Sequence, residues 1–170
     1  LILYTFSKRF AMTGWRLGAA IGPAELIGVI TTLNVNHESC SSHFLQYGAL
    51  AGLQGDQSEV EAILKTLRQR RDTLVDGLNA IPGVACHKPR STFYLYPRVT
   101  PLLQDLGMDL ETFRKDLLQS TGVSVCGRHH FGRPGPDEDR GYLRLAYSGI
   151  DTAGIEKALA ALADYVRNRT

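Results

Sequence analysis

The chain has 170 residues, of which 44% are hydrophobic and 21% are charged. This composition is typical of a globular protein with a buried core, and it excludes collagen-like and intrinsically disordered chains. The 19 basic and 17 acidic residues leave a net charge of +2 and are scattered along the chain, which argues against a nucleic-acid-binding protein. No stretch reaches the roughly 18 apolar residues of a membrane span, so no membrane partner is expected.

The cysteines indicate the cellular compartment of the protein, and the first residues indicate whether the sequence is a fragment. Cys40, Cys86 and Cys126 are odd in number and widely spaced, which suits reduced thiols in a cytoplasmic compartment better than a disulfide scaffold. The chain begins with Leu1, and its first six residues already have the pattern of a strand. We therefore expect a fragment of a longer protein.

Strands and helices are predicted to alternate over the first half of the chain. Residues 1–6 and 17–21 are apolar runs typical of strands that are buried on both faces, and residues 7–15 between them are predicted to form a loop. Because Pro23 favours a helix start, helices are expected over 24–33 and, after a polar stretch, over 43–53. The longest predicted helix covers 57–79, with these apolar residues on one face: Val60, Ile63, Leu64, Leu67, Leu74, Val75 and Leu78.

The second half of the chain is predicted to be a mixture of short strands and helices. Asp109 is the expected N-cap of a helix that carries Phe113 and Leu117, and a last helix is expected over 152–168. The order helix, two strands, helix, two strands, helix is compatible with an α+β layer. The four strands are predicted over 84–87, 93–96, 123–126 and 142–147.

A cluster of reactive and polar residues follows the first predicted strand. A lysine at the end of an apolar strand, here Lys8, can be partly desolvated, and its amine can then attack a carbonyl to form a Schiff base. The hydroxyls of Thr5 and Ser7 and the guanidinium of Arg16 are donors that suit a phosphate dianion. Pyridoxal phosphate requires this combination. On residue types alone, a solvated and inert lysine remains the more common alternative.

The longer sequence around Lys8 favours the catalytic interpretation of this lysine. The sequence Ser-Lys-Arg-Phe-Ala-Met-Thr-Gly-Trp-Arg-Leu-Gly, residues 7–18, resembles the cofactor-lysine signature of class I/II aminotransferases, the aspartate aminotransferase-like family of pyridoxal-phosphate enzymes. The resemblance implies that Lys8 is the catalytic lysine that binds pyridoxal 5'-phosphate. It also implies that Arg16, Ser7 and Thr5 hold the cofactor phosphate.

Two later segments continue the resemblance. Residues 92–97, Thr-Phe-Tyr-Leu-Tyr-Pro, are similar to a strand of the family's small domain, and residues 142–148, Tyr-Leu-Arg-Leu-Ala-Tyr-Ser, are similar to its last strand. The resemblance places the arginine that binds the substrate carboxylate at Arg144. The strand pattern agrees, because Leu143 and Leu145 share one face and Arg144 projects from the other. Ser91 departs from the family, which usually has a glycine at that place.

The resemblance implies an α/β protein: the C-terminal part of the fold type I architecture of pyridoxal-phosphate transferases. Residues 1–54 would be a remnant of the large-domain sheet, and residues 55–170 an α+β small domain. The parent would exchange an amino group between an amino acid and a 2-oxo acid, and would be a homodimer. Because the family's residues that face the cofactor ring lie before its lysine, we expect the 170-residue chain alone to be an incomplete active site.

Three alternatives stay open or are disfavoured. Relatives of the family use the same lysine for lyase chemistry, and others serve as the effector domains of transcriptional regulators. Cys126, His129 and His130 could be metal ligands, but no second pair stands at a suitable spacing, so no metal is expected.

Overall fold

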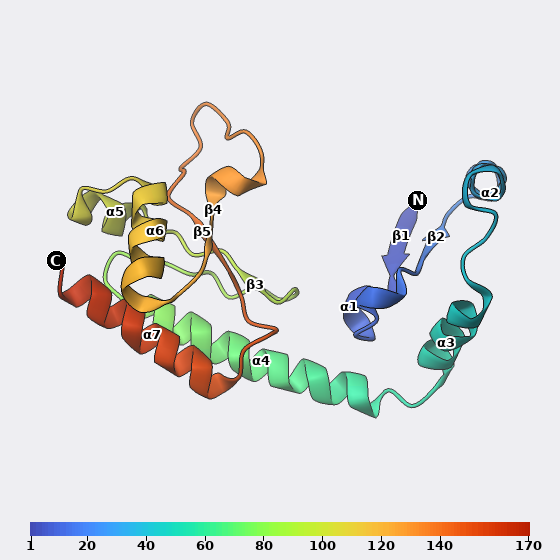
Figure 1. Ribbon diagram of the computed structural model, residues 1–170, viewed down its shortest axis with the longest axis horizontal. Coiled ribbons are helices and arrows are strands. Elements are labelled where there is room, and N and C mark those ends of the chain that lie inside the picture. The colour runs from blue at the N-terminus through green and yellow to red at the C-terminus, as the bar shows by residue number, and fades with distance from the viewer. The chain divides into compact units, whose positions relative to one another are not determined.

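The computed structural model describes all residues from 1 to 170, which divide into two compact units. The N-terminal unit comprises Leu1–Ile63 and the C-terminal unit comprises Leu64–Thr170. The division falls within the long helix α4 (Ser58–Asn79), labelled in Figure 1. No helix combines the length and the apolar character that a membrane span requires.

The N-terminal unit begins with an antiparallel hairpin of β1 (Ile2–Thr5) and β2 (Gly18–Ile21). Thr5 lies opposite Gly18 in the ladder. A Cβ atom at Gly18 would lie 2.8 Å from the carbonyl oxygen of Tyr4, so only glycine allows this approach of the two strands. The expectation of strands buried on both faces is wrong for this chain, since Leu3 is 77% exposed and Ile21 56% exposed. Of the β1 side chains, Tyr4 packs against the core of this unit, whereas Ile2 and Leu3 are exposed.

The segment between these strands is more regular than the predicted loop. It contains the single-turn helix α1 (Phe6–Arg9) and a 3₁₀ helix, η1 (Thr13–Trp15). The Oγ1 atom of Thr5 caps α1 by accepting a hydrogen bond of 3.2 Å from the backbone N–H of Ser7. Elements of three or four residues are too short to show a periodicity, and the sequence therefore did not reveal them.

Two helices complete the N-terminal unit. The first, α2 (Ala24–Glu38), continues five residues beyond its predicted end at residue 33, and α3 (His43–Gln54) follows it. Within α2, the side chain of Asn36 donates a hydrogen bond of 2.7 Å to the carbonyl of Thr32, so polar residues extend the helix. The core of this unit is small and consists of Phe6, Met12, Leu17 and Ala49.

The C-terminal unit is built on a three-stranded antiparallel sheet in the order β3-β5-β4. Its strands are β3 (Tyr94–Leu95), β4 (Cys126–Gly127) and β5 (Leu143–Ala146), and a 3₁₀ helix, η2 (Arg128–Phe131), follows β4. The strand expected over 84–87 is wrong, because that segment forms a single bridge between Ala85 and Arg98. The helices are α5 (Thr100–Leu106), α6 (Leu110–Thr121) and α7 (Thr152–Arg167).

Helix ends in this unit follow the predicted capping chemistry. Asp109 accepts hydrogen bonds from the backbone N–H groups of Glu111 and Thr112 at 2.9 and 3.0 Å, which confirms it as the N-cap of α6. Asp151 caps α7 in the same way. The seven-residue helix α5 was not predicted, because it is too short for a clear apolar stripe.

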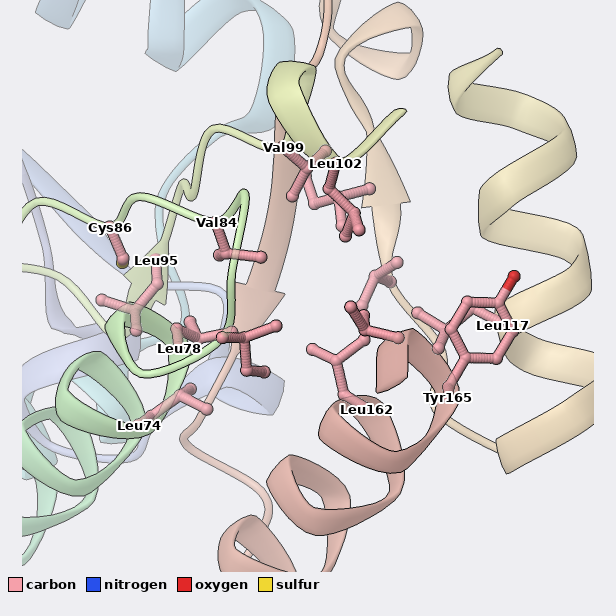
Figure 2. Close-up of a cluster of buried hydrophobic side chains, with 14 of the residues drawn as sticks. Leu74, Leu78, Val84, Cys86, Leu95, Val99, Leu102, Leu117, Leu162 and Tyr165 are labelled. Carbon is pink, nitrogen blue, oxygen red and sulfur yellow. The ribbon is translucent and has the colours of Figure 1, made fainter. Parts of the chain in front are cut away.

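The core of the C-terminal unit contains 19 buried residues, and Figure 2 shows part of it, including Leu74 and Leu78 of α4 and Leu162 of α7. In Figure 1, α7 runs beside the second half of α4. Gly77 permits this packing, because a Cβ atom there would lie 2.3 Å from Cδ1 of Leu159. The predicted apolar face of α4 is buried only in part, since Ile63 and Leu64 are each more than 40% exposed.

Candidate functional site

The segment that carries the predicted cofactor residues is a closed loop on the hairpin of the N-terminal unit. The backbone N–H of Phe6 donates a hydrogen bond of 3.4 Å to the carbonyl of Leu17, one step beyond the ladder pair of Thr5 and Gly18. Phe6 and Leu17 are buried, so the ends of the loop are anchored in the core. Ser7 follows Phe6 directly and Arg16 precedes Leu17, and the closure therefore holds these two residues at the same end of the hairpin.

Each predicted cofactor residue has a defined place on this loop. Thr5 ends β1, Ser7 and Lys8 lie in α1, and Arg16 follows the 3₁₀ helix. Ser7 is 8% exposed, whereas Lys8 and Arg16 are exposed. Arg16 has a left-handed backbone conformation with φ of 53°, and its guanidinium donates a hydrogen bond of 3.2 Å to the carbonyl of Thr13. Thr5 and Ser7 are joined by the capping hydrogen bond described above.

Helix α3 packs against two aromatic rings of the loop. A Cβ atom at Gly48 would lie 2.5 Å from Cζ3 of Trp15, and one at Gly52 would lie 3.4 Å from Cδ1 of Phe10. The two glycines are four residues apart, so both rings rest on one face of the helix. Trp15 thus packs the loop against α3.

The donor set of this loop fits pyridoxal phosphate. The amine of Lys8 matches an aldehyde, while the hydroxyls of Thr5 and Ser7 and the guanidinium of Arg16 match a phosphate dianion. All four groups belong to a stretch of twelve residues whose two ends are hydrogen-bonded to each other. The loop therefore carries all four of the groups that the sequence assigned to the cofactor.

Comparisons with known proteins decide the family. The sequence model described as aminotransferase class I and II matches residues 1–162. The chain belongs to this family. It is 36% identical to the aspartate aminotransferase of Musicola paradisiaca over 94% of the chain, and it spans 39% of the length of that enzyme. Class I and II aminotransferases are pyridoxal-phosphate enzymes, and the prediction of the family is confirmed.

Solved aminotransferase structures share the fold. The aspartate aminotransferase of Rhizobium meliloti matches 98% of the chain with a TM-score of 0.84 and 30% identity. An aromatic aminotransferase of Pyrococcus horikoshii matches with the same TM-score and identity. The chain covers 41% and 43% of those two chains, so it corresponds to less than half of such an enzyme. These matches confirm the prediction of the fold type I architecture of pyridoxal-phosphate transferases.

Arg144, the predicted carboxylate-binding arginine of this aminotransferase chain, lies in β5 between two aromatic rings. Its guanidinium carbon is 4.6 Å from the ring centres of both Tyr94 and Phe131. Its Nη2 atom is 3.7 Å from the sulfur of Cys126, the residue directly opposite in the ladder. At these distances both rings attract the guanidinium by cation–π interaction. Arg144 forms no ion pair with a carboxylate of the chain, so its guanidinium has no charged partner within the chain.

Sequence reasoning did not assign Tyr94, Phe131 and Cys126 to the surroundings of Arg144. The segments that hold Tyr94 and Phe131 are separated from Arg144 by 50 and 13 positions, and only the β3-β5-β4 register brings them together. A correct strand pairing would have been the signal, because Cys126 is then the cross-strand neighbour of Arg144.

The histidines after Cys126 have protein partners. Nε2 of His129 is 3.2 Å from a carboxylate oxygen of Glu111, and Nδ1 of His130 accepts a hydrogen bond of 3.2 Å from the backbone N–H of Gly127. The Glu111 carboxyl also binds Arg114, which lowers its pKa to about 2. These contacts give both histidines a structural role beside β4.

Proposed function

We propose that this chain supplies the cofactor lysine and the substrate-carboxylate arginine of an aminotransferase. The enzyme transfers an amino group between an amino acid and a 2-oxo acid. The observation that supports this proposal most strongly is the closed loop that carries Thr5, Ser7, Lys8 and Arg16 in a chain of this family. Pyridoxal phosphate, when bound, supplies an aldehyde for the substrate amine and a ring that accepts electrons from Cα.

Lys8 has two roles in the proposed function. Its Nζ atom binds the cofactor aldehyde between turnovers, and as a free amine it removes the proton from Cα of the substrate. Lys8 lies in α1, three residues after Thr5, the N-cap of that helix, and this short distance along the chain ties its backbone to the hairpin. Arg16 and the hydroxyls of Thr5 and Ser7 neutralise and orient the cofactor phosphate by charge-assisted hydrogen bonds.

Arg144 binds the substrate carboxylate in this proposal. A planar guanidinium pairs with a carboxylate through two parallel hydrogen bonds, and the rings of Tyr94 and Phe131 attract this guanidinium by cation–π interaction. Fixing the carboxylate orients the Cα–H bond, so Arg144 contributes to the rate through orientation as well as affinity.

The further proposals concern the whole enzyme. We infer that residues 1–54 form the end of the large cofactor-binding domain and residues 55–170 the small domain. We also infer that the enzyme is a cytoplasmic homodimer. Cys40, Cys86 and Cys126 are all free thiols in the structure, which supports the compartment.

Reductive labelling tests the role of Lys8. The complete parent enzyme is incubated with pyridoxal phosphate, reduced with borohydride and digested, and the labelled peptide is identified by mass spectrometry. We expect the label on Lys8 and its loss in Lys8→Ala, with Lys65→Ala as the matched control. A label that maps mainly to another lysine would refute the assignment.

Two variants separate the cofactor and substrate roles. In the longer enzyme, Arg144→Ala should raise the activation free energy of amino-acid turnover by on the order of 2–4 kcal/mol, because a charge-assisted bidentate contact is lost. Cofactor retention should stay nearly intact. Arg16→Ala should mainly weaken cofactor retention. Equal losses of both properties in both variants would contradict this division. The 170-residue chain alone should show no amino transfer above the rate of free pyridoxal phosphate.

A further inference from the structure

A groove of about 280 Å³ opens in the C-terminal unit, and none of its lining residues is among those that contact Arg144. One side is formed by α4, on which Leu64, Leu67, Arg68 and Arg71 recur at three- and four-residue steps and so share a face. The other lining residues come from the segment before β3 and from the end of β5. They are Arg90, Ser91, Thr92 and Tyr147.

The segment before β3 is held in place by two hydrogen bonds. Nη1 of Arg71 donates to the carbonyl of Pro89 at 3.0 Å, and the hydroxyl of the buried Tyr147 donates to the carbonyl of Thr92 at 2.8 Å. Thr92 has φ of 70°, a conformation that a threonine rarely adopts without such support. The backbone that carries Arg90 and Ser91 is therefore preorganised.

The charges around the groove are not balanced. Asp72 accepts from Arg71 at 2.8 Å and from Lys88 at 2.9 Å, so one carboxylate serves two cations. These contacts lower the pKa of the Asp72 carboxyl, chiefly through the hydrogen bond from Arg71. Arg68 and Arg90 form no hydrogen bond or ion pair within the chain. Two guanidinium groups thus line one groove without a counter-charge, and an anion between them would relieve their repulsion.

We propose that this groove binds a small dianion, either a phosphate monoester or a dicarboxylate. Arg68 and Arg90 would supply charge-assisted hydrogen bonds to its oxygens, and the hydroxyls of Ser91 and Thr92 would add neutral donors. Arg71 fixes the groove wall and contributes positive charge. The proposal does not depend on the roles of Lys8 and Arg144, because neither residue lines the groove.

Titrations followed by nuclear magnetic resonance test the proposal on the ¹⁵N-labelled chain. Inorganic phosphate and succinate are the probes, acetate is the monoanion control, and ionic strength is held constant with sodium chloride because exposed charges are screened. We expect saturable shifts of the Ser91 and Thr92 amides with phosphate, succinate or both, and much weaker shifts with acetate. A response to only one dianion identifies the class of ligand.

Charge variants show whether the two arginines are responsible. Arg68→Gln/Arg90→Gln should weaken dianion binding roughly tenfold, since each exposed pair contributes up to about fivefold. The double variant Arg133→Gln/Arg167→Gln makes the same change in net charge at exposed sites elsewhere and should bind as the parent does. Equal shifts with acetate, absence of saturation, or unchanged affinity in the groove variant would overturn the proposal. Labelling of Lys8 is unaffected by any of these outcomes.

Discussion

The two units of the chain differ in how they bury apolar surface. The C-terminal unit has 19 buried core residues around its sheet, whereas the N-terminal unit has four beneath its loop. Many large apolar side chains of the N-terminal unit are exposed, among them Leu3, Leu33 and Phe44. The unit with the most specific signature therefore has the least core of its own. The residues of the signature lie on the loop, whereas most of the buried core residues lie in the C-terminal unit.

The same contrast extends to polar contacts. Side-chain contacts tie loops and helix ends together in the C-terminal unit. They include the Arg98–Asp139 pair, the N-cap Asp109 and the Arg128–Glu138 ion pair. The loop of the N-terminal unit is instead closed by backbone pairing and by two ring contacts on α3. A local signature and a stable core are thus separate properties, and variants in each unit distinguish them.

The largest expected effect is the loss of a core ring from the C-terminal unit. Phe113 is fully buried, so Phe113→Ala should lower the free energy of unfolding by about 3–5 kcal/mol through lost burial and a cavity. Denaturant unfolding followed by circular dichroism measures this change. Fluorescence of Trp15, the single tryptophan, reports on the N-terminal unit and should change little.

Phe44→Ala is the matched control in the N-terminal unit. Phe44 is 73% exposed, so its loss should change the free energy of unfolding by less than about 0.5 kcal/mol. A large loss for Phe44→Ala, or a small one for Phe113→Ala, would break the contrast between the two units.

A smaller effect is expected from a backbone contact in the C-terminal unit. Gly83 has φ of 75°, and a Cβ atom there would lie 2.8 Å from the backbone nitrogen of Leu102. Gly83→Ala should destabilise the unit by about 1–3 kcal/mol, because the strained backbone must shift against α5. The midpoint of thermal unfolding measures this destabilisation. Gly14→Ala, in open space in the N-terminal unit, should leave the midpoint nearly unchanged, and equal shifts would count against the steric argument.

The smallest effect concerns acid stability. Asp139 accepts from the Thr100 hydroxyl, from the Gly141 N–H and from Nε of Arg98, and these contacts lower its pKa to about 2. Because the folded-state pKa lies below the ordinary value of 3.8, the stabilisation is present above about pH 4 and is lost as pH falls toward 2.

Asp139→Asn should therefore cost about 1 kcal/mol at neutral pH, since the carboxylate is partly exposed. The difference from the parent should shrink as the pH falls from 4 to 2. Denaturant midpoints measured across that range test this expectation. A difference that stays constant with pH would show that the charge of Asp139 is not the source of its effect.

Local signals were sufficient for the helices and for the family. The apolar spacing of residues 57–79 predicted α4, Asp109 predicted the start of α6, and the string around Lys8 indicated the aminotransferase class. Each of these signals lies within one stretch of sequence, where hydrogen bonding and side-chain period act between near neighbours. The short elements α1 and α5 were missed because they have too few turns to show a period.

Other features were decided only by tertiary structure. The sequence placed Arg144 on a strand face, but strand register brings Tyr94, Phe131 and Cys126 around it. In the same way, the groove joins Arg68 to Arg90, 22 positions apart, through the packing of α4 beside the segment before β3. The exposure of β1 and β2 also followed from which elements cover them, and not from their apolar residues. Side-chain chemistry and helix period are local, whereas register, packing and burial depend on contacts between residues far apart in the chain.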